Sequence, residues 1–268
     1  MFEELKPHIK ELRSRLTICV AVIFIAFFAC FYAWEIILQF MISPLEDVLP
    51  EGSELIFVKV QEPFFTAVKV SFFSSFIISL PIIFWQFWAF VAPGLYDNEK
   101  ALVIPFVLFA TVMFFLGASF SYYVVTPIGF EFLIGFGSAL FKAMPSIGEY
   151  VGFFTKLIVG FGIAAELPVV TFFLAKIGLV TDGMLRQFFR YAIIIIFVFS
   201  ALLTPPDLIT QFLMAVPMVG LYIISIYIAK VINPSAPEDE NDEDESDEDE
   251  ESDATKEDKE ASTDTPSK

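Results

Sequence analysis

The sequence predicts an all-α integral membrane protein with six transmembrane helices and both termini in the cytoplasm. Apolar residues make up 56% of the 268 residues, and 34 residues are phenylalanine, a composition typical of membrane proteins. Several apolar segments reach the roughly 20 residues that a helix needs to cross a hydrocarbon core about 30 Å thick. No segment shows the alternation of apolar and polar residues that is typical of transmembrane barrel strands.

Residues 1–15 are predicted to form a short amphipathic helix on the membrane surface. Its apolar residues recur at helical spacing and form one stripe. They are Phe2, Leu5, Ile9, Leu12 and Leu16. Proline is tolerated in the first turn of a helix, so Pro7 places the helix start near Lys6. Glu11 and Arg15 lie four residues apart, a spacing that supports an intrahelical ion pair.

The transmembrane domain is predicted over residues 16–230. Its spans are bounded by proline, glycine or charged residues, and Pro81 is expected to kink the second one. The six spans cover residues 16–39, 65–90, 102–125, 151–176, 188–203 and 208–228. Two longer loops, 43–62 and 126–150, are predicted at one side of the bundle, and a short polar connection covers 178–187.

The fifth span is short for a membrane. Only residues 191–203 are strictly apolar, which gives about 20 Å of helix against a core of about 30 Å. The turn Thr204-Pro205-Pro206-Asp207 would then lie inside the outer half of the bilayer. We therefore hypothesise that the bilayer is thinner beside the fifth and sixth spans. Spin labels at Thr204 and Asp207 that report bulk-like water access in an undistorted bilayer would contradict this hypothesis.

Basic residues gather on one side of the predicted bundle. That side carries Lys6, Lys10, Arg13, Arg15, Lys100, Lys176, Arg186, Arg190 and Lys230. The other side carries Lys59, Lys69, Lys142 and Lys156. Because basic residues favour the cytoplasmic side of a membrane, this bias predicts that both termini are cytoplasmic. An even number of spans agrees with that orientation.

Residues 231–268 are predicted to form a disordered acidic tail in the cytoplasm. Residues 238–268 carry 17 acidic and 3 basic side chains, so they account for −14 of the formal net charge of −17. The segment has too few apolar residues to form a core. The acidity of the chain therefore says little about the partners of its membrane domain.

The sequence indicates no metal site, no cofactor site and no enzyme. Cys19 and Cys30 are about 16 Å apart along one predicted helix, too far for a disulfide, and His8 is the single histidine. Metal and haem sites need clustered or paired ligands. The chain also offers no nucleophile–base pair and no phosphate-binding glycine loop.

One carboxylate lies deep in a predicted span. Glu166 is midway between Lys156 and Lys176, and a carboxylate at that depth costs at least about 2.5 kcal/mol unless it is protonated, paired or hydrated. No basic residue lies at matching depth in another span, so its partner is water, a polar side chain such as Gln211, or another protein. Two interpretations stay open: a structural hydrogen bond between spans, or a functional role as a polar anchor for a partner helix or in a hydrated cavity.

A second carboxylate stands just outside the membrane. An aromatic-rich apolar helix runs into Pro93-Gly94, and the chain becomes polar at residues 97–100. Glu99 at this place could bind a basic ligand that lies on the membrane surface. Taken alone, its position favours an ordinary surface charge, because a glutamate before a lysine in a turn is a weak signal.

Five separated blocks of the sequence together resemble the TatC family, the multispanning receptor of the twin-arginine protein translocase. The blocks are residues 8–16 (HIKELRSRL); Pro63-Phe64-Phe65 with Lys69; residues 86–96 (QFWAFVAPGLY) with Glu99; Phe161-Gly162 with Glu166 and Pro168; and Thr204-Pro205-Pro206-Asp207 with Gln211. The resemblance covers residues 2–230. It is specific because all five blocks occur in this order on six predicted spans.

The resemblance implies that Glu11 and Glu99 form an acidic surface that meets the two arginines of a signal peptide. Guanidinium–carboxylate pairs are charge-assisted and can be bidentate, which suits this role. The other matching positions are Arg13, Arg15, Phe90, Pro93 and Gly94. In the family's pattern the two arginines would pair with the carboxylates, the phenylalanine would support the loop, and the Pro-Gly pair would set its turn.

The resemblance also implies a polar groove inside the membrane, where single-span TatA- and TatB-like subunits dock. The matching residues are Glu166, Thr204, Asp207 and Gln211. It further implies export of folded proteins across a bacterial inner membrane, driven by the proton-motive force. We expect self-association and contact with lipid, and neither a cofactor nor a nucleic-acid partner.

Two other functions are considered. A secondary transporter of a small cation or metabolite would use Glu166 as its ion site, but it predicts broken spans in both halves and further buried charges. A passive assembly scaffold predicts that the substitutions Glu11→Ala and Glu99→Ala leave export unchanged.

Overall fold

The computed structural model describes residues 2–50, 52–91, 103–136, 142–204 and 207–235, with side chains from residue 9 onward except that of Val103. Its elements are α1 (Phe2–Tyr32), α2 (Trp34–Glu46), α3 (Glu62–Val91), α5 (Val103–Phe120), the π-helical turn η2 (Ser121–Val125), α6 (Thr126–Gly135), α7 (Ile147–Lys176), α8 (Asp182–Gln187), α9 (Phe189–Leu203) and α10 (Leu208–Ile232). Within these residues five helices are long and apolar enough to cross a membrane, and α9 is a shorter apolar helix. The prediction of an all-helical membrane protein is confirmed.

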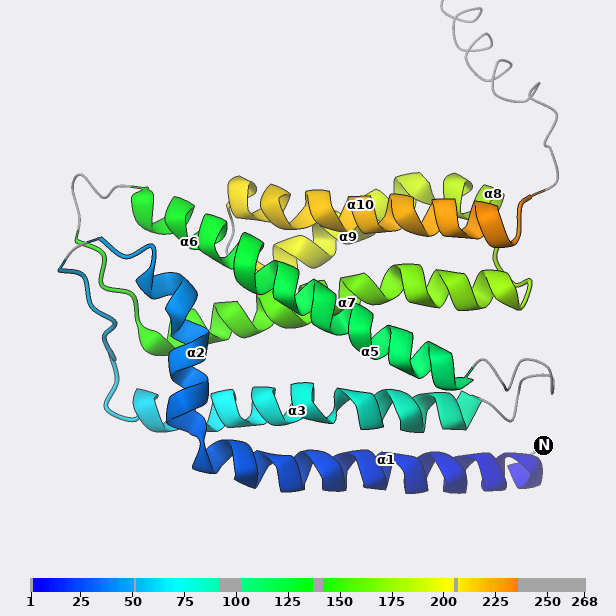
Figure 1. Ribbon diagram of the computed structural model, residues 1–268, viewed down its shortest axis with the longest axis horizontal. Helices are drawn as coiled ribbons and strands as arrows, with labels where there is room; N and C mark the ends of the chain where they lie inside the picture. The colour runs from blue at the N-terminus through cyan, green and yellow to red at the C-terminus, as the bar shows by residue number, and fades with distance from the viewer. Residues whose placement is uncertain (1, 51, 92–102, 137–141, 205–206, 236–268) are drawn as a thin grey trace, which may run out of the picture. The chain divides into compact units, whose positions relative to one another are not determined.

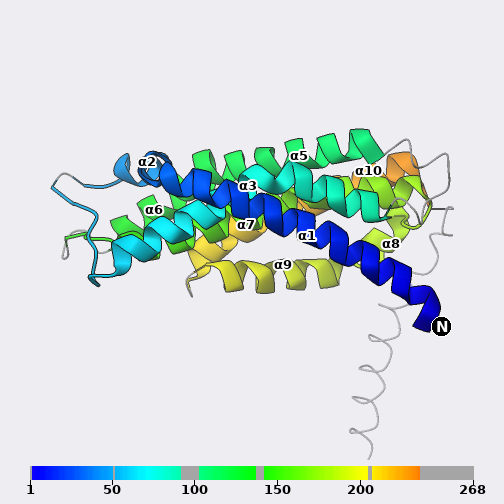
Figure 2. The same ribbon diagram turned by 90° about the horizontal axis from the view of Figure 1, so that it is seen from below.

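The long helices give the unit that spans residues 1–233 two ends (Figure 1). We call one the α8 end: α1, α5 and α9 begin there, and α3, α7 and α10 end there. The opposite end, which we call the α2 end, holds α2 and the connections that precede α3 and α7. Helix α5 crosses the bundle obliquely, and α5 and α9 lie on opposite sides of α7 (Figure 2).

The N-terminal segment and the first span form one continuous helix. Helix α1 begins at Phe2 and runs to Tyr32 without a break, so the amphipathic segment predicted over residues 1–15 is its first half. Pro7 is the sixth residue of α1, past its first turn, so the helix continues through a residue that cannot donate a backbone hydrogen bond. The expected start near Lys6 was therefore wrong.

The first span ends earlier than residue 39. Ala33 leaves the helical conformation, with φ −103° and ψ 17°, and α2 then runs across the end of the bundle (Figure 1). The predicted boundary was wrong because apolar residues continue through the break, so hydropathy alone shows no end. The first part of the predicted loop 43–62 is accordingly helical.

Two tyrosines hold α2 in place. Pro44 has no backbone N–H, so the carbonyl of Phe40 one turn earlier loses its helical partner. The Tyr122 hydroxyl donates to that carbonyl at 2.8 Å, and the two rings stack with centroids 4.7 Å apart. The Tyr150 hydroxyl donates to the next carbonyl, that of Met41, at 2.5 Å. Helix α2 is thus attached to η2 and α7 by bonds that satisfy its own backbone.

The third span is longer than predicted. It continues from α5 through η2 into α6, so residues 126–135 are helical and were wrongly assigned to a loop. Pro127 cannot donate a hydrogen bond to the preceding turn, and the wider π-helical turn just before it accommodates this gap. The remaining boundaries agree with the predicted spans to within a few residues.

Glycines allow α5 and α7 to cross at close range. A Cβ atom on Gly117 would lie 2.5 Å from the Phe161 carbonyl oxygen and 2.7 Å from the Ala165 Cβ. A Cβ atom on Gly162 would lie 2.5 Å from the buried ring of Phe114. Small residues let helix backbones approach in membranes, where packing replaces the hydrophobic effect between helices.

The connections that precede α3 and α7 are hydrogen-bonded to each other at the α2 end. Ile56 and Ser146 form an isolated bridge, in which the Ile147 amide donates to the Ile56 carbonyl at 2.9 Å. The Glu62 carboxylate accepts the amides of Gly148 and Val58, both at 2.8 Å, that of Lys59 at 3.2 Å, and the Ser146 hydroxyl. One side chain therefore links the starts of α3 and α7.

Candidate functional site

The first candidate site lies on α1 near the α8 end and is formed by Glu11, Arg15 and Gln86, which we call the Glu11 surface. Arg15 donates to Glu11 Oε1 from Nη2 at 2.7 Å and from Nε at 3.1 Å. Its third donor, Nη1, reaches Gln86 Oε1 on α3 at 3.3 Å. The ion pair predicted from the four-residue spacing is therefore confirmed. Gln86 additionally fixes the guanidinium against a second helix.

The geometry leaves Glu11 able to bind more than Arg15. Both bonds from Arg15 end on Oε1, so the second carboxylate oxygen is not used by this pair. The side chain of Glu11 is 34% exposed and that of Arg15 is 25% exposed, which leaves the pair accessible from outside. A carboxylate accepts bonds at both oxygens, so Glu11 can receive a further cationic donor.

An aromatic cluster holds the helix ends beside this surface. The rings of Trp88, Phe106 and Phe173 pack edge to face, with centroids 4.1 to 5.1 Å apart, and join α3, α5 and α7. Phe90 is half-buried in the last turn of α3. The last turn of α3, the first turn of α5 and the last turn of α7 are thus packed together.

Several predicted site residues are not positioned by the structure. Glu99, Pro93 and Gly94 lie outside the described residues, between the end of α3 and the start of α5. Arg13 is exposed, and its backbone carbonyl accepts the Thr17 hydroxyl at 2.7 Å. The pairing of Arg13 with a carboxylate stays a prediction.

Glu166 is the second candidate site. It is half-buried on α7, and its Oε1 atom is buried with no hydrogen-bond partner among the described residues. Gln211, one of its expected partners, instead donates from Nε2 to the Phe197 carbonyl at 3.1 Å. A buried carboxylate oxygen without a partner is costly, so the site favours a partner from outside this chain or water.

The other two residues of the predicted groove serve the turn between α9 and α10. Thr204 is buried, and its hydroxyl donates to the Ser200 carbonyl at 3.0 Å at the end of α9. Asp207 caps α10 by accepting the Thr210 amide at 2.7 Å and the Thr210 hydroxyl. Their joint action with Glu166 in one groove stays a prediction.

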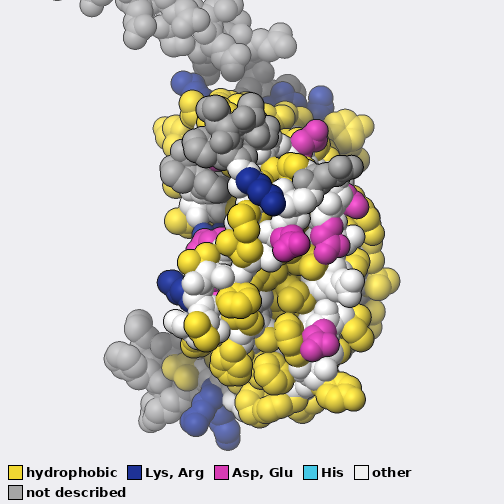
Figure 3. Space-filling model, turned by 90° about the vertical axis from the view of Figure 1, so that its left-hand side faces the viewer, with side chains coloured by type: hydrophobic (Ala, Val, Ile, Leu, Met, Phe, Trp, Pro, Cys, Tyr) yellow, Lys and Arg dark blue, Asp and Glu magenta, His cyan; other side chains and the backbone are white. Residues whose placement is uncertain are grey.

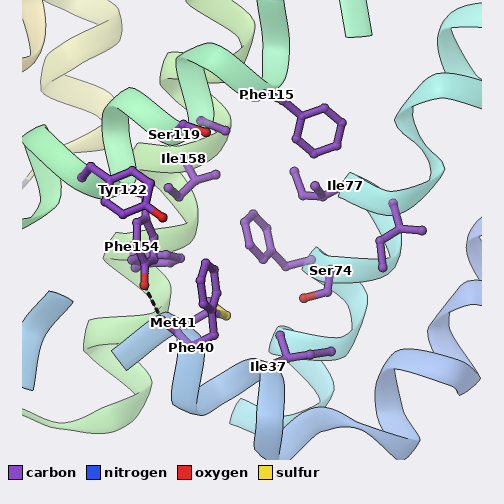
Figure 4. Close-up of a pocket in the computed structure, with 14 residues that line it drawn as sticks. Ile37, Phe40, Met41, Ser74, Ile77, Phe115, Ser119, Tyr122, Phe154 and Ile158 are labelled. Atoms are coloured by element: carbon purple, nitrogen blue, oxygen red, sulfur yellow. Dashed lines mark hydrogen bonds between the residues drawn. The ribbon is translucent and has the colours of Figure 1, made fainter. Parts of the chain in front are cut away.

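The surface also contains an open apolar pocket that the sequence did not indicate. It has a volume of about 400 Å³ and lies between α2, α3, the α5–η2 segment and α7 (Figure 4). Phe40, Ile77, Phe115 and Phe154 are among its apolar lining, with the hydroxyls of Ser74 and Ser119 at its wall. It shares no lining residue with the Glu11 surface or with Glu166.

The sequence did not predict the contacts of Gln86 and Glu62. Gln86 was noted only as part of a block, although an amide in an apolar span signals a polar partner on another helix. Glu62 was not singled out, because nothing in the sequence shows that its four donors converge. Among the described residues no three His, Cys, Asp or Glu side chains are grouped as metal ligands.

Comparison with known proteins gives one consistent result. A profile of the family described as Sec-independent protein translocase protein (TatC) matches residues 7–217. A relative of that name from Campylobacter jejuni is 57% identical over 241 residues, covering 89% of this chain and 98% of the relative. The relative from Escherichia coli is 36% identical over 228 residues, covering 85% of this chain and 88% of the relative.

A solved structure shows the same fold. The crystal structure described as twin arginine translocase receptor TatC is 40% identical to this chain and superposes with a TM-score of 0.78. The alignment covers 84% of this chain and 99% of that structure.

Proposed function

Because this chain belongs to the TatC family of Sec-independent protein translocase proteins, we propose that it is the receptor that recognises twin-arginine signal peptides. It is a multi-pass membrane protein and a component of a protein translocase. In this proposal the Glu11 surface and Glu99 bind the paired arginines of the signal peptide. Family membership favours this function over the secondary transporter considered from Glu166 alone.

The observation that carries the proposal is the anchored carboxylate of Glu11. Arg15 holds Glu11 by one oxygen while Gln86 holds Arg15, so the free side of the carboxylate is oriented in advance. Such preorganisation lowers the entropy that a ligand loses on binding. A site beside the low-dielectric membrane also loses less attraction to screening than a site in open water.

The proposed orientation places both termini, the Glu11 surface and Glu99 in the cytoplasm of a bacterial inner membrane. It rests on the excess of basic residues at the α8 end. We further propose that the chain acts as a binding and assembly subunit and not as an enzyme. In that role it associates with TatA- and TatB-like helices and with other copies of itself, and the proton-motive force drives export.

Site-specific photocrosslinking tests recognition. A photoreactive residue at Ser14, which is exposed one turn after Glu11, or at Asn98, which precedes Glu99 in the sequence, leaves both carboxylates in place. It is expected to capture a twin-arginine signal peptide several times more efficiently than the same peptide with two lysines, since lysine lacks the bidentate guanidinium fork. A photoreactive residue at Glu35, an exposed acid on α2, provides the control. Equal capture of both peptides at positions 14 and 98, or capture of neither, would contradict the proposed recognition.

Glu166 is proposed to bind a single-span partner helix through its unpartnered oxygen. Glu166→Ala is expected to weaken co-purification of TatA- or TatB-like subunits by about three- to fifteenfold, the effect of one polar contact between helices in a membrane. Glu166→Gln, which keeps a hydrogen-bonding group, should retain part of the association. If Glu166→Ala also abolishes crosslinks to the signal peptide, Glu166 has a folding role and the proposal is wrong.

A further inference from the structure

An open pocket at the α2 end that is lined by charged side chains has no role in the function proposed above. It has a volume of about 420 Å³ and lies beside the connection that precedes α3, the first turns of α3 and the start of α7. Its charged lining residues are Lys59, Glu62, Lys69 and Glu149. We propose that this site, which we call the Lys59–Lys69 pocket, binds the headgroup of a zwitterionic phospholipid.

The two lysines are available to a ligand. Both are exposed, and neither forms a salt bridge with another described residue. Glu62, the nearest acid in sequence, is already occupied by its three backbone amides and the Ser146 hydroxyl. The pocket therefore presents two unpaired ammonium groups, which are suitable partners for the phosphate of a lipid.

The surface around the pocket belongs to the interface of a membrane. Five large apolar side chains beside it are exposed: Phe57, Val58, Val60, Phe64 and Phe65, with exposed fractions from 55% to 91%. Figure 3 views this end, where apolar side chains are interspersed with basic and acidic ones. Apolar and aromatic side chains next to charged groups are typical of the headgroup zone of a bilayer. Under the proposed orientation this zone belongs to the outer leaflet.

The charge of the pocket selects the kind of headgroup. Glu149 lies in the first turn of α7, is exposed and also lines the pocket. Its carboxylate repels an anionic headgroup and attracts an ammonium group. Two lysines for the phosphate and one carboxylate for the amine match phosphatidylethanolamine better than phosphatidylglycerol.

Native mass spectrometry of the purified full chain in detergent, titrated with each of the two lipids, tests the proposal. The wild type is expected to retain one phosphatidylethanolamine more tightly than phosphatidylglycerol. The double variant Lys59→Gln/Lys69→Gln is expected to bind it about tenfold more weakly. The control is Lys142→Gln/Lys156→Gln, which removes the same charge from the same side of the membrane outside the pocket and should bind like the wild type.

Several outcomes would overturn the proposal. Unchanged binding by Lys59→Gln/Lys69→Gln would show that the pocket is not the site, and an equal loss in the control pair would show a general effect of charge. If the wild type binds phosphatidylglycerol more tightly than phosphatidylethanolamine, a zwitterionic headgroup is excluded. It is also excluded if Glu149→Gln prefers phosphatidylethanolamine as strongly as the wild type does. Displacement of the lipid by millimolar inorganic phosphate would indicate a site for free anions.

Discussion

Replacing Glu11 with alanine is expected to weaken binding of a twin-arginine signal peptide by about ten- to a hundredfold and to abolish export of its cargo. A hydrogen bond to a charged group contributes about 1.5–3 kcal/mol, and each 1.4 kcal/mol corresponds to a factor of ten. The variant also leaves the Arg15 guanidinium without its carboxylate partner. That positive charge would then repel the arginines of the incoming peptide, which adds to the loss.

The measurement is the affinity of a labelled signal peptide for the purified protein in nanodiscs, at low and at high salt. Because charge pairs at an exposed surface are screened, wild-type affinity should fall with salt, and the Glu11→Ala variant should show a smaller dependence. Glu35→Ala is the matched control, since it removes an exposed acid on α2 and should leave binding unchanged. Wild-type affinity in the Glu11→Ala variant would refute the role of the Glu11 surface.

Glu99→Ala is expected to weaken binding of the signal peptide by a similar factor, because the proposed ligand carries two guanidinium groups and each needs a carboxylate. The double variant Glu11→Ala/Glu99→Ala should lose less than the sum of the two single losses if one ligand contacts both residues at once. Strict additivity would indicate two independent effects.

The second large effect is expected where α5 crosses α7. Gly117→Ala should destabilise the fold by about 1–3 kcal/mol, because its methyl group would lie 2.5 Å from a backbone oxygen that cannot move without shifting α7. Gly162→Ala should destabilise it by a similar or smaller amount, because the obstructing atoms belong to the Phe114 side chain. In water-exposed helices, replacing glycine with alanine usually stabilises the helix by up to about 1 kcal/mol. The sign of the change in unfolding free energy therefore tests whether the two helices are closely packed here.

Thermal unfolding of the purified variants in detergent measures this effect. Gly152→Ala is the matched control on α7, since a Cβ atom there meets no atom within 4 Å. It should unfold at the wild-type temperature or slightly above it, while Gly117→Ala should unfold several degrees lower. If Gly117→Ala and Gly152→Ala unfold at the same temperature, the close crossing does not limit the packing of these helices.

The candidate site was partly predictable from the sequence. The Glu11–Arg15 pair follows from a four-residue spacing on one helix, and Glu166 stands out because a carboxylate in an apolar span is costly. Gln86 could not be assigned to Arg15, because the two residues are 71 positions apart and meet only when α1 packs on α3. Gln211 was one of three candidate partners for Glu166, beside water and another protein, but its amide donates to the Phe197 carbonyl instead.

The span boundaries also include some that the sequence predicted and some that depend on packing between helices. The ends of α3, α7 and α10 coincide with changes from apolar to polar sequence, so hydropathy located them closely. The break at Ala33 and the π-helical turn η2 fall inside apolar sequence, where hydropathy does not change. Contacts with other helices stabilise both features, such as the bonds from Tyr122 in η2 and from Tyr150 in α7 to α2.

By itself the sequence determined that this chain is a helical membrane protein, and it singled out the carboxylates at positions 11 and 166. The spans and Glu166 follow from the free energy of transferring a segment or a charge into the membrane, and the Glu11–Arg15 pair follows from a four-residue spacing on one helix. Both are local to one segment. Only the tertiary structure decided how Arg15 is shared between Glu11 and Gln86, how closely α5 approaches α7, and how Glu62 joins two connections. These features depend on which distant segments pack together, and the hydropathy and charge of a single segment do not specify that choice.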